Sequence, residues 1–256
     1  ASLGLRIITN NREGLTVKHS RAGGRVVVVT GPSGVGKGTL LQRLKDNHPG
    51  IHFSVSATTR SPRSGEVQGQ HYFFVTPADF HAMVVAGELL EWAEFAGNCY
   101  GTPRKPVEEQ VKQGNLVILE VEVEGARQVR QTFPDALQIF VLPPSLQELE
   151  QRLRNRGQDP EASISRRLAR AQMEIAAASE FDVQVVNDHL TTALQTLEEI
   201  LLGEPGGTVL PDRSIAGPNA AASLPDRDLR SVEMMATQAI GTEADDWEDL
   251  DDPDGL

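Results

Sequence analysis

Apolar runs alternate along the chain with segments in which apolar residues recur every three or four positions. The runs predict buried strands, and the recurring segments predict amphipathic helices. Strands are predicted at residues 26–30, 53–55, 71–75, 89–95, 116–122, 137–142 and 183–188. Helices are predicted between them, among others at residues 145–157 and 160–175, and a last one ends at residue 202. This alternation predicts an α/β fold of three layers, with helices on both faces of a parallel core sheet.

Turn and cap signals refine this pattern. Thr76 precedes Pro77 and is suited to cap a helix, and Ser145 with Glu148 has the spacing of a capping box. Residues 98–103 contain glycine and proline and are predicted to form a turn. Residues 56–104 therefore form a small, β-rich insertion between two halves of the α/β core.

Both ends of the chain differ from the segment between them. Residues 1–24 have little periodicity and predict a poorly structured extension, although Leu3, Leu5, Ile7 and Ile8 are compatible with a short strand. Their basic residues resemble a transit peptide only faintly. Residues 204–256 are rich in glycine, proline, alanine and aspartate and bury too little apolar area to offset chain entropy, so a disordered acidic tail is expected. A solvating tail is the simpler interpretation, and docking of Trp247 and Leu250 on an unknown basic partner is the alternative.

Charge and composition exclude several function classes. The net charge is -12, of which the tail contributes -10, so the remaining chain is nearly neutral and nucleic acid is not an expected partner. No apolar stretch approaches the ~18 residues of a membrane span. The single cysteine excludes an intramolecular disulfide, and the histidines show no metal-ligand spacing. A cytoplasmic protein is expected, with import into an organelle as the weaker alternative.

A glycine-rich segment follows the first strong strand and leads into a helix with Leu40, Leu41 and Leu44 on one face. Its residues are Gly31, Pro32, Ser33, Gly34, Val35, Gly36, Lys37, Gly38 and Thr39. Glycine lets successive N–H groups approach a polyphosphate, the helix N-terminus adds partial positive charge, and Lys37 adds a full one. The layout predicts a phosphate-binding loop, and the flanking strand and helix disfavour a plain glycine-rich turn with a surface lysine.

One position of this loop departs from the usual motif. The eighth residue, normally Ser or Thr with its hydroxyl on Mg²⁺, is Gly38, and Thr39 follows it. We therefore expect Mg²⁺ to be held mainly by phosphate oxygens and water.

Two further groups of polar residues suggest anion binding. Arg60 and Arg63 lie among hydroxyl residues after a strand, although a plain polar connection fits that spacing equally well. Arg152 and Arg156 share a helix face, and Arg166, Arg167 and Arg170 lie on the next helix. These arginines suit stabilisation of a transferred phosphoryl group, and a solvated helix face is the alternative.

The order of these segments resembles that of guanylate kinases. The resemblance rests on residues 31–39, 53–66 (FSVSATTRSPRSGE), 71–74, 90–95, 98–102, 120–125 and 143–156, within residues 25–202. It implies phosphoryl transfer from ATP to GMP, giving ADP and GDP, with Mg²⁺ as cofactor and dGMP as a further acceptor. It also implies a core of residues 25–55, 105–144 and 171–203, a GMP-binding insertion at 56–104, and a helical lid at 145–170.

The resemblance also implies roles for individual residues. The GMP phosphate would be held by Arg60, Arg63, Tyr72 and Tyr100, and Glu66 belongs to the same GMP site. Ser56 and Thr102 would meet guanine O6, while Glu91 and Glu122 would accept from N1–H and the amino group. ATP would be bound by the glycine-rich segment with Arg152, Arg156 and Asn187, and catalysis would depend on Lys37, Arg152, Arg156 and Arg167. Glu120 and Glu122 stand where some relatives have Asp, so carboxylate reach can differ.

Two alternatives come from other classes. A non-catalytic guanylate-kinase-like module that binds phosphorylated partners is disfavoured because Gly36, Lys37 and the lid arginines are all present. A kinase of a sugar phosphate is disfavoured, because a base-reading site is suggested by four residues together: Tyr72, Tyr100, Glu91 and Glu122.

Overall fold

The central element of the fold is β2 (Arg25–Thr30), in which four consecutive valines are all buried. We describe a computed structural model, which covers residues 7–9, 23–155 and 160–203. Val27 and Val29 pack on one side of the sheet, and Val26 and Val28 pack on the other. A strand buried on both faces in this way is typical of a parallel sheet covered by helices.

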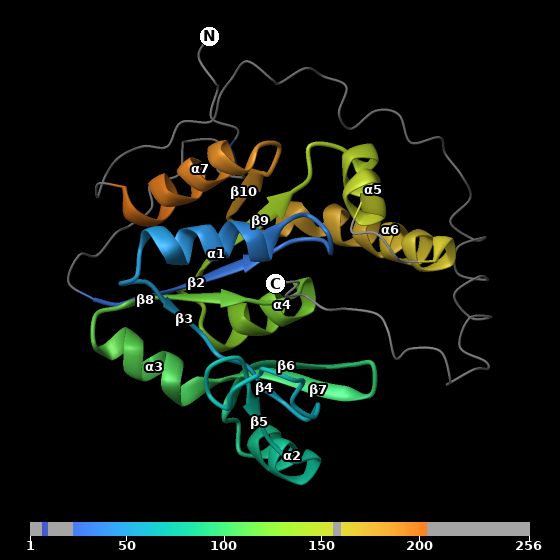
Figure 1. Ribbon diagram of the computed structural model, residues 1–256. Coiled ribbons are helices and arrows are strands. Elements are labelled where there is room, and N and C mark those ends of the chain that lie inside the picture. Colours follow the sequence, from blue (N-terminus) through green and yellow to red (C-terminus); the bar gives the residue numbers. More distant parts are fainter. Residues whose placement is uncertain (1–6, 10–22, 156–159, 204–256) are drawn as a thin grey trace. The chain divides into compact units, whose positions relative to one another are not determined.

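Six strands of the described chain form the core sheet, in the order β1-β10-β9-β2-β8-β3 (Figure 1). Besides β2 they are β1 (Ile7–Thr9), β3 (His52–Phe53), β8 (Leu116–Glu120), β9 (Leu137–Leu142) and β10 (Val183–Val186). Neighbouring strands are parallel except β1, which pairs antiparallel with β10. The carboxyl ends of β2, β8, β9 and β10 therefore meet at one edge, where α/β proteins bind ligands.

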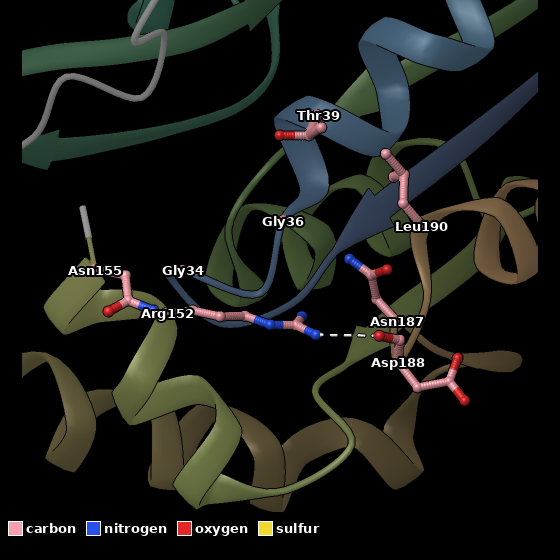
Figure 2. A pocket seen from close by; sticks show the side chains of 8 residues that line it. All are labelled: Gly34, Gly36, Thr39, Arg152, Asn155, Asn187, Asp188 and Leu190. Carbon is pink, nitrogen blue, oxygen red and sulfur yellow. Dashed lines mark hydrogen bonds between the residues drawn. The ribbon is translucent and has the colours of Figure 1, made fainter.

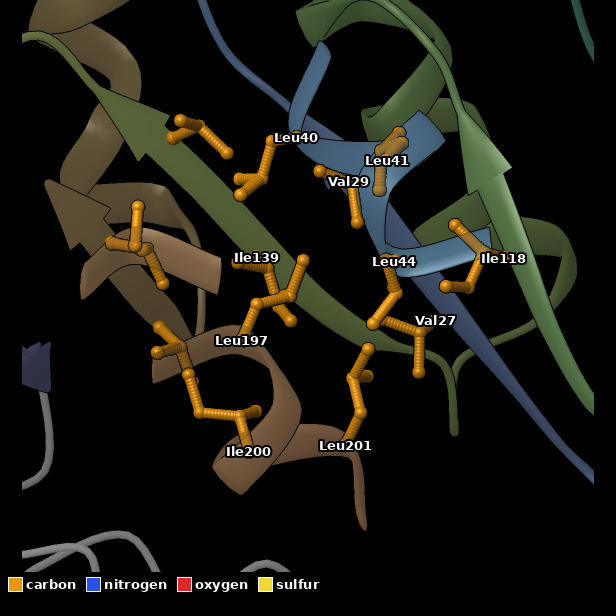
Figure 3. Packing of buried hydrophobic residues seen from close by; sticks show 14 of the residues in the cluster. Val27, Val29, Leu40, Leu41, Leu44, Ile118, Ile139, Leu197, Ile200 and Leu201 are labelled. Atoms are coloured by element: carbon orange, nitrogen blue, oxygen red, sulfur yellow. The ribbon is translucent and has the colours of Figure 1, made fainter. Parts of the chain in front are cut away.

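Helices cover both faces of this sheet (Figure 1). On one face lie α1 (Lys37–Asn47) and α7 (Leu190–Leu202), whose leucines and isoleucines interdigitate with β2 and β9 (Figure 3). On the other lie α3 (Arg104–Lys112), α4 (Val123–Thr132) and the short 3₁₀ helix η1 (Ala177–Glu180). The three-layer α/β/α prediction is confirmed.

A second sheet forms the predicted β-rich insertion. Its order is β5-β4-β7-β6, from β4 (Ala57–Thr58), β5 (Phe73–Phe74), β6 (Leu89–Phe95) and β7 (Asn98–Pro103). Helix α2 (Pro77–Val85) packs on it through Phe80 and is capped by Thr76, whose hydroxyl accepts from Asp79 N at 3.1 Å.

Two helices follow β9 at the edge where the strands end. They are α5 (Leu146–Asn155) and α6 (Glu161–Ala176), packed together through Leu149, Leu153 and Ala171. Ser145 Oγ accepts from Glu148 N at 3.1 Å, as the capping box predicted.

Several expected boundaries are wrong. The predicted turn at 98–103 is strand β7, because the chain reverses earlier, at Ala96 and Gly97, with φ of 48° and 72°. Helix α3 was not predicted, and the strands expected at 53–55 and 71–75 are shorter. Within the poorly structured extension expected at 1–24, residues 7–9 form β1. The acidic tail at 204–256 lies outside the described residues.

Packing of α7 onto β2 and β9 should dominate the stability of this face. Leu197 is fully buried there, whereas Leu202 at the end of the same helix is 47% exposed. We expect Leu197→Ala to lower the free energy of unfolding by about 2–5 kcal/mol, measured by urea denaturation. Leu202→Ala should change it by less than about 1 kcal/mol, and an equal loss in both variants would contradict this account of the core.

Candidate functional site

The loop between β2 and α1 turns at glycines that no other residue can replace without strain. Gly31, Gly34 and Gly36 have φ of 149°, 83° and 96°. A Cβ on Gly31 would lie 2.3 Å from Val141 O. At these glycines no side chain keeps a ligand away from the backbone, which is what an anion-binding loop requires.

The Lys37 ammonium lies at this loop, at the start of α1. Its Nζ donates to Gly31 O at 2.7 Å and to Pro32 O at 3.3 Å. The helix N-terminus and a cation thus meet at the end of the central strand, which is an arrangement suited to phosphate.

A pocket of about 360 Å³ lies beside the loop, a volume that suits a small-molecule site (Figure 2). It is lined by Gly34, Gly36, Thr39, Arg152, Asn155, Asn187, Asp188 and Leu190. Asn187 is buried and donates to Val35 O at 2.8 Å. Asn155, Asp188 and Leu190 were not predicted, although the position of Asp188 and Leu190 after a parallel strand was an available signal.

The helices α5 and α6 bring two arginines to the same loop. Arg152 donates to Val35 O at 3.3 Å and to Asp188 O at 3.4 Å, and Glu148 Oε1 lies 3.1 Å from its Nε. Arg167 donates to Ser33 Oγ at 2.9 Å. Arg156, predicted to act with them, lies outside the described residues.

A second cluster lies on the insertion, around the Arg60 guanidinium. Both of its terminal nitrogens donate to Glu66, at 3.0 Å and 2.7 Å, and Glu66 Oε2 accepts from Arg63 N at 2.6 Å. Arg60 also lies over the Tyr72 ring at 5.4 Å, and Tyr72 packs against Tyr100. The hydrogen bond from Arg60 lowers the pKa of Glu66. The structure therefore gives Glu66 a position that the sequence did not: it holds the Arg60 guanidinium and the backbone at Arg63.

Glu91 of β6 is a buried carboxylate, 8% exposed. The Thr102 hydroxyl donates to its Oε1 at 2.6 Å, and a Cβ on Gly125 would lie 2.8 Å from its Oε2. Burial raises the pKa of Glu91, although the hydrogen bonds from Thr102 oppose the rise. Because the Thr102 proton points to Glu91, a contact of this hydroxyl with guanine O6 would require it to change partner.

The remaining predicted residues lie close to these groups. Glu122 is the N-cap residue of α4, two residues after the end of β8, and it accepts a hydrogen bond from Arg170 of α6. Glu120 is the exposed last residue of β8. Ser56 precedes β4, and its carbonyl accepts from Phe73 N at 2.8 Å. The contact between Glu122 and Arg170 was not predicted, because Arg170 was expected to serve the transferred phosphoryl group, with a solvated helix face as the alternative.

The described residues include neither a metal-binding cluster nor a membrane-spanning helix. They contain no group of three or more His, Cys, Asp or Glu that could hold a metal ion. No helix in this part of the chain is both long and apolar enough to cross a bilayer.

Comparison with known proteins identifies the family. A family model for guanylate kinase matches residues 23–204. The chain belongs to the guanylate kinase family. Guanylate kinase of Trichodesmium erythraeum is 61% identical over 178 residues, which is 70% of this chain and 96% of that relative. Guanylate kinase of Thermosynechococcus vestitus is 62% identical over 175 residues, 68% of this chain and 92% of the relative. The crystal structure of guanylate kinase from Anaplasma phagocytophilum has a TM-score of 0.56 at 32% identity, covering 71% of this chain and 86% of that one.

The buried carboxylate predicts a pH-dependent effect on stability. Because its pKa is raised on folding, the native state binds more protons than the unfolded state between the two pKa values, so the free energy of unfolding falls as pH rises through this window. Above the folded-state pKa the full cost of the charged carboxylate persists. We expect Glu91→Gln to raise the free energy of unfolding at pH 7.5 and to leave it nearly unchanged at pH 4, as measured by urea denaturation.

The control is Glu94→Gln, at an exposed position of the same strand. Glu94→Gln should change the free energy of unfolding by the same amount at pH 7.5 and at pH 4. A Glu91→Gln variant that is less stable at pH 7.5 than at pH 4, relative to the parent chain, would contradict the assignment of an unfavourable buried charge.

Proposed function

We propose that two groups of residues divide the work of the guanylate kinase reaction, ATP + GMP → ADP + GDP, in this chain. Membership of the family makes the chain an ATP:GMP phosphotransferase, and the loop with its intact Lys37 distinguishes it from a module that only binds. The observation that carries the division is that the loop pocket and the buried Glu91 lie on separate elements. Helix α6 contacts Ser33 of the loop and Glu122 at the start of α4.

The donor site is proposed at the loop between β2 and α1. Loop N–H groups and Lys37 Nζ bind the ATP phosphates, and Asn187 and Arg152 line the adjoining pocket. Arg152 and Arg167 stabilise charge on the transferred group, as arginines do in phosphoryl transfer. The part assigned to Arg156 stays a prediction.

Mg²⁺ fits this donor site as an ion bound by the phosphates of the nucleotide. Gly38 offers no side-chain oxygen, and the exposed Thr39 lines the pocket. Phosphate oxygens and water would therefore supply most of its ligands, in keeping with its preference for retained water. When bound, it neutralises charge on the β- and γ-phosphates.

The acceptor site is proposed in the insertion and at the start of α4. Arg60, Arg63, Tyr72 and Tyr100 hold the GMP phosphate, with Glu66 orienting the Arg60 guanidinium and fixing the backbone at Arg63. Glu91 and Glu122 accept from guanine N1–H and the amino group, and Ser56 faces O6. We assign Thr102 to the orientation of Glu91, because its proton is directed there.

Hydrogen bonding in this pocket explains the choice of base. Guanine presents two donors on its Watson–Crick edge, whereas adenine presents an acceptor at N1. A buried carboxylate such as Glu91 would face that acceptor unpaired if AMP entered. Sites of this kind reject the wrong partner by factors of about 10⁴–10⁵.

In this proposal the protein forms no covalent bond with the substrates, and its main contribution is to close around them. The proposed regions are a core of residues 25–55, 105–144 and 171–203, the insertion at 56–104, and a lid at 145–170. Movement of insertion and lid toward the loop would align the GMP phosphate with the γ-phosphorus and exclude water, which limits ATP hydrolysis. We also propose dGMP as an acceptor and a cytoplasmic setting.

A coupled assay tests the proposed activity and its selectivity. With ATP and Mg²⁺ we expect turnover of GMP and dGMP, and kcat/KM for AMP and UMP lower by a factor of about 10⁴. Absence of GDP formation, or equal turnover of AMP, would contradict the proposal.

Gly125 offers a second test, because a methyl group there intrudes on Glu91. We expect Gly125→Ala to raise KM for GMP roughly tenfold through displacement of the carboxylate, since a charged hydrogen bond contributes about 1.5–3 kcal/mol, and to leave KM for ATP within twofold. Gly50→Ala is the control, because nothing lies within 4 Å of its added Cβ. If Gly125→Ala leaves KM for GMP unchanged, Glu91 does not contact the base.

A further inference from the structure

Arg170 of α6 was grouped by the sequence with the arginines suited to phosphoryl transfer, yet its described contacts are with two glutamates and an aromatic ring. Its terminal nitrogen donates to Glu122 Oε2 at the start of α4. Its Nε donates to Glu174 Oε1 at 3.0 Å, one turn further along α6. Its guanidinium lies 5.9 Å from the centre of the Phe95 ring, at the end of β6 in the insertion.

We propose that Arg170 is a specificity-positioning residue, which holds the Glu122 carboxylate in the orientation that accepts the 2-amino group of guanine. The proposal rests on the assignment of Glu122 to the base in the proposed function. It adds a residue that acts on the substrate only through Glu122.

The need for such a residue follows from where Glu122 lies. Its side chain is 65% exposed at the N-cap of α4, so packing alone does not fix its rotamer. A carboxylate has two oxygens, so Glu122 can accept from Arg170 through Oε2 and from an amino group through Oε1. A forked, planar guanidinium fixes the direction of a carboxylate better than a lysine ammonium does.

Arg170 is itself held in place from its own helix. Glu174, at 14% side-chain exposure, accepts from its Nε. Glu174 Oε2 is buried without a hydrogen-bond partner in the described structure, so the carboxylate depends on the nearby positive charges, first of Arg170 and then of Lys37. Burial raises the pKa of Glu174, and the charge of Arg170 opposes that rise.

The same helix connects this carboxylate to the phosphate-binding loop. Arg167 lies one turn before Arg170 on α6, and it donates to Ser33 Oγ. Residues three apart lie on neighbouring positions of a helix surface. Movement of α6 during closure therefore shifts the contact at the donor loop and the contact at the proposed base pocket together.

The test compares GMP with inosine monophosphate, which keeps N1–H and O6 but lacks the 2-amino group. We expect Arg170→Gln to raise KM for GMP roughly tenfold, to change KM for inosine monophosphate by less than about threefold, and to leave KM for ATP within twofold. The reason is that Glu122 would lose the charged partner that directs it toward the 2-amino group. Arg170→Lys should have a KM for GMP between those of the parent chain and Arg170→Gln. It keeps a positive charge, so it guards against a variant that fails to fold.

Arg127→Gln is the matched control. Arg127 has the same 43% side-chain exposure and also bridges two glutamates, Glu124 and Glu180, but it contacts neither site. It should leave all three KM values unchanged. Equal effects of Arg170→Gln on GMP and inosine monophosphate, or no effect on either, would overturn the proposal.

Glu122→Gln separates this inference from the proposed function. It should lower the preference for GMP over inosine monophosphate, and Arg170→Gln in that background should lower it no further, because the two residues act as one unit. If Glu122→Gln leaves the preference intact, the assignment of Glu122 fails and the inference fails with it. If Glu122→Gln lowers the preference but Arg170→Gln does not, only the role of Arg170 is refuted.

Discussion

A chain can hold a polyphosphate only where its backbone comes closer to phosphate oxygens than a Cβ atom permits, and the structure around β2 satisfies that constraint. Buried valines fix the central strand from both faces, so the loop that follows it starts from a rigid position. The neighbouring ends of β8, β9 and β10 then place Glu122, α5 and Asn187 around the same edge. The roles proposed for the donor site and for Glu122 depend on this common edge rather than on proximity in the sequence.

Sequence patterns predicted the parts of the fold that depend on interactions between residues close in the chain. The valines of β2 and the leucines of α1 signal burial within a few residues, and the caps at Thr76 and Ser145 are contacts over three residues. Strand β7 was missed because Gly101 and Pro103 have the signature of a turn, whereas its conformation is set by pairing with β4 and β6 on both sides. Helix α3 was missed because only Val107 of its residues is buried.

The same distinction applies to the candidate site. The loop could be found because its residues are consecutive and its conformation requires glycine. The contacts of Gly125 with Glu91 and of Arg170 with Glu122 join segments 34 and 48 residues apart, and only tertiary structure brings them together. The family resemblance named Glu91 and Glu122, but it gave no reason for their orientation.

The two glutamates reach the same chemistry through opposite environments. Glu91 is removed from water and depends on one hydroxyl, so its charge costs stability. Glu122 is largely hydrated and depends on an arginine for direction. In the proposed acceptor site, the buried Glu91 would provide most of the rejection of the wrong base, because a carboxylate removed from water is costly to leave unpaired.

The pairing of β1 with β10 has a consequence for association between molecules. A strand at the margin of a sheet offers unsatisfied amides and carbonyls to any other extended chain, and β10 would do so over four residues without β1. At the opposite margin, β3 is only two residues long and offers little to pair with. The short segment Ile7–Thr9, outside the region that resembles guanylate kinases, thus covers β10 and replaces a margin of four residues by one of three, which leaves less strand for another chain to pair with.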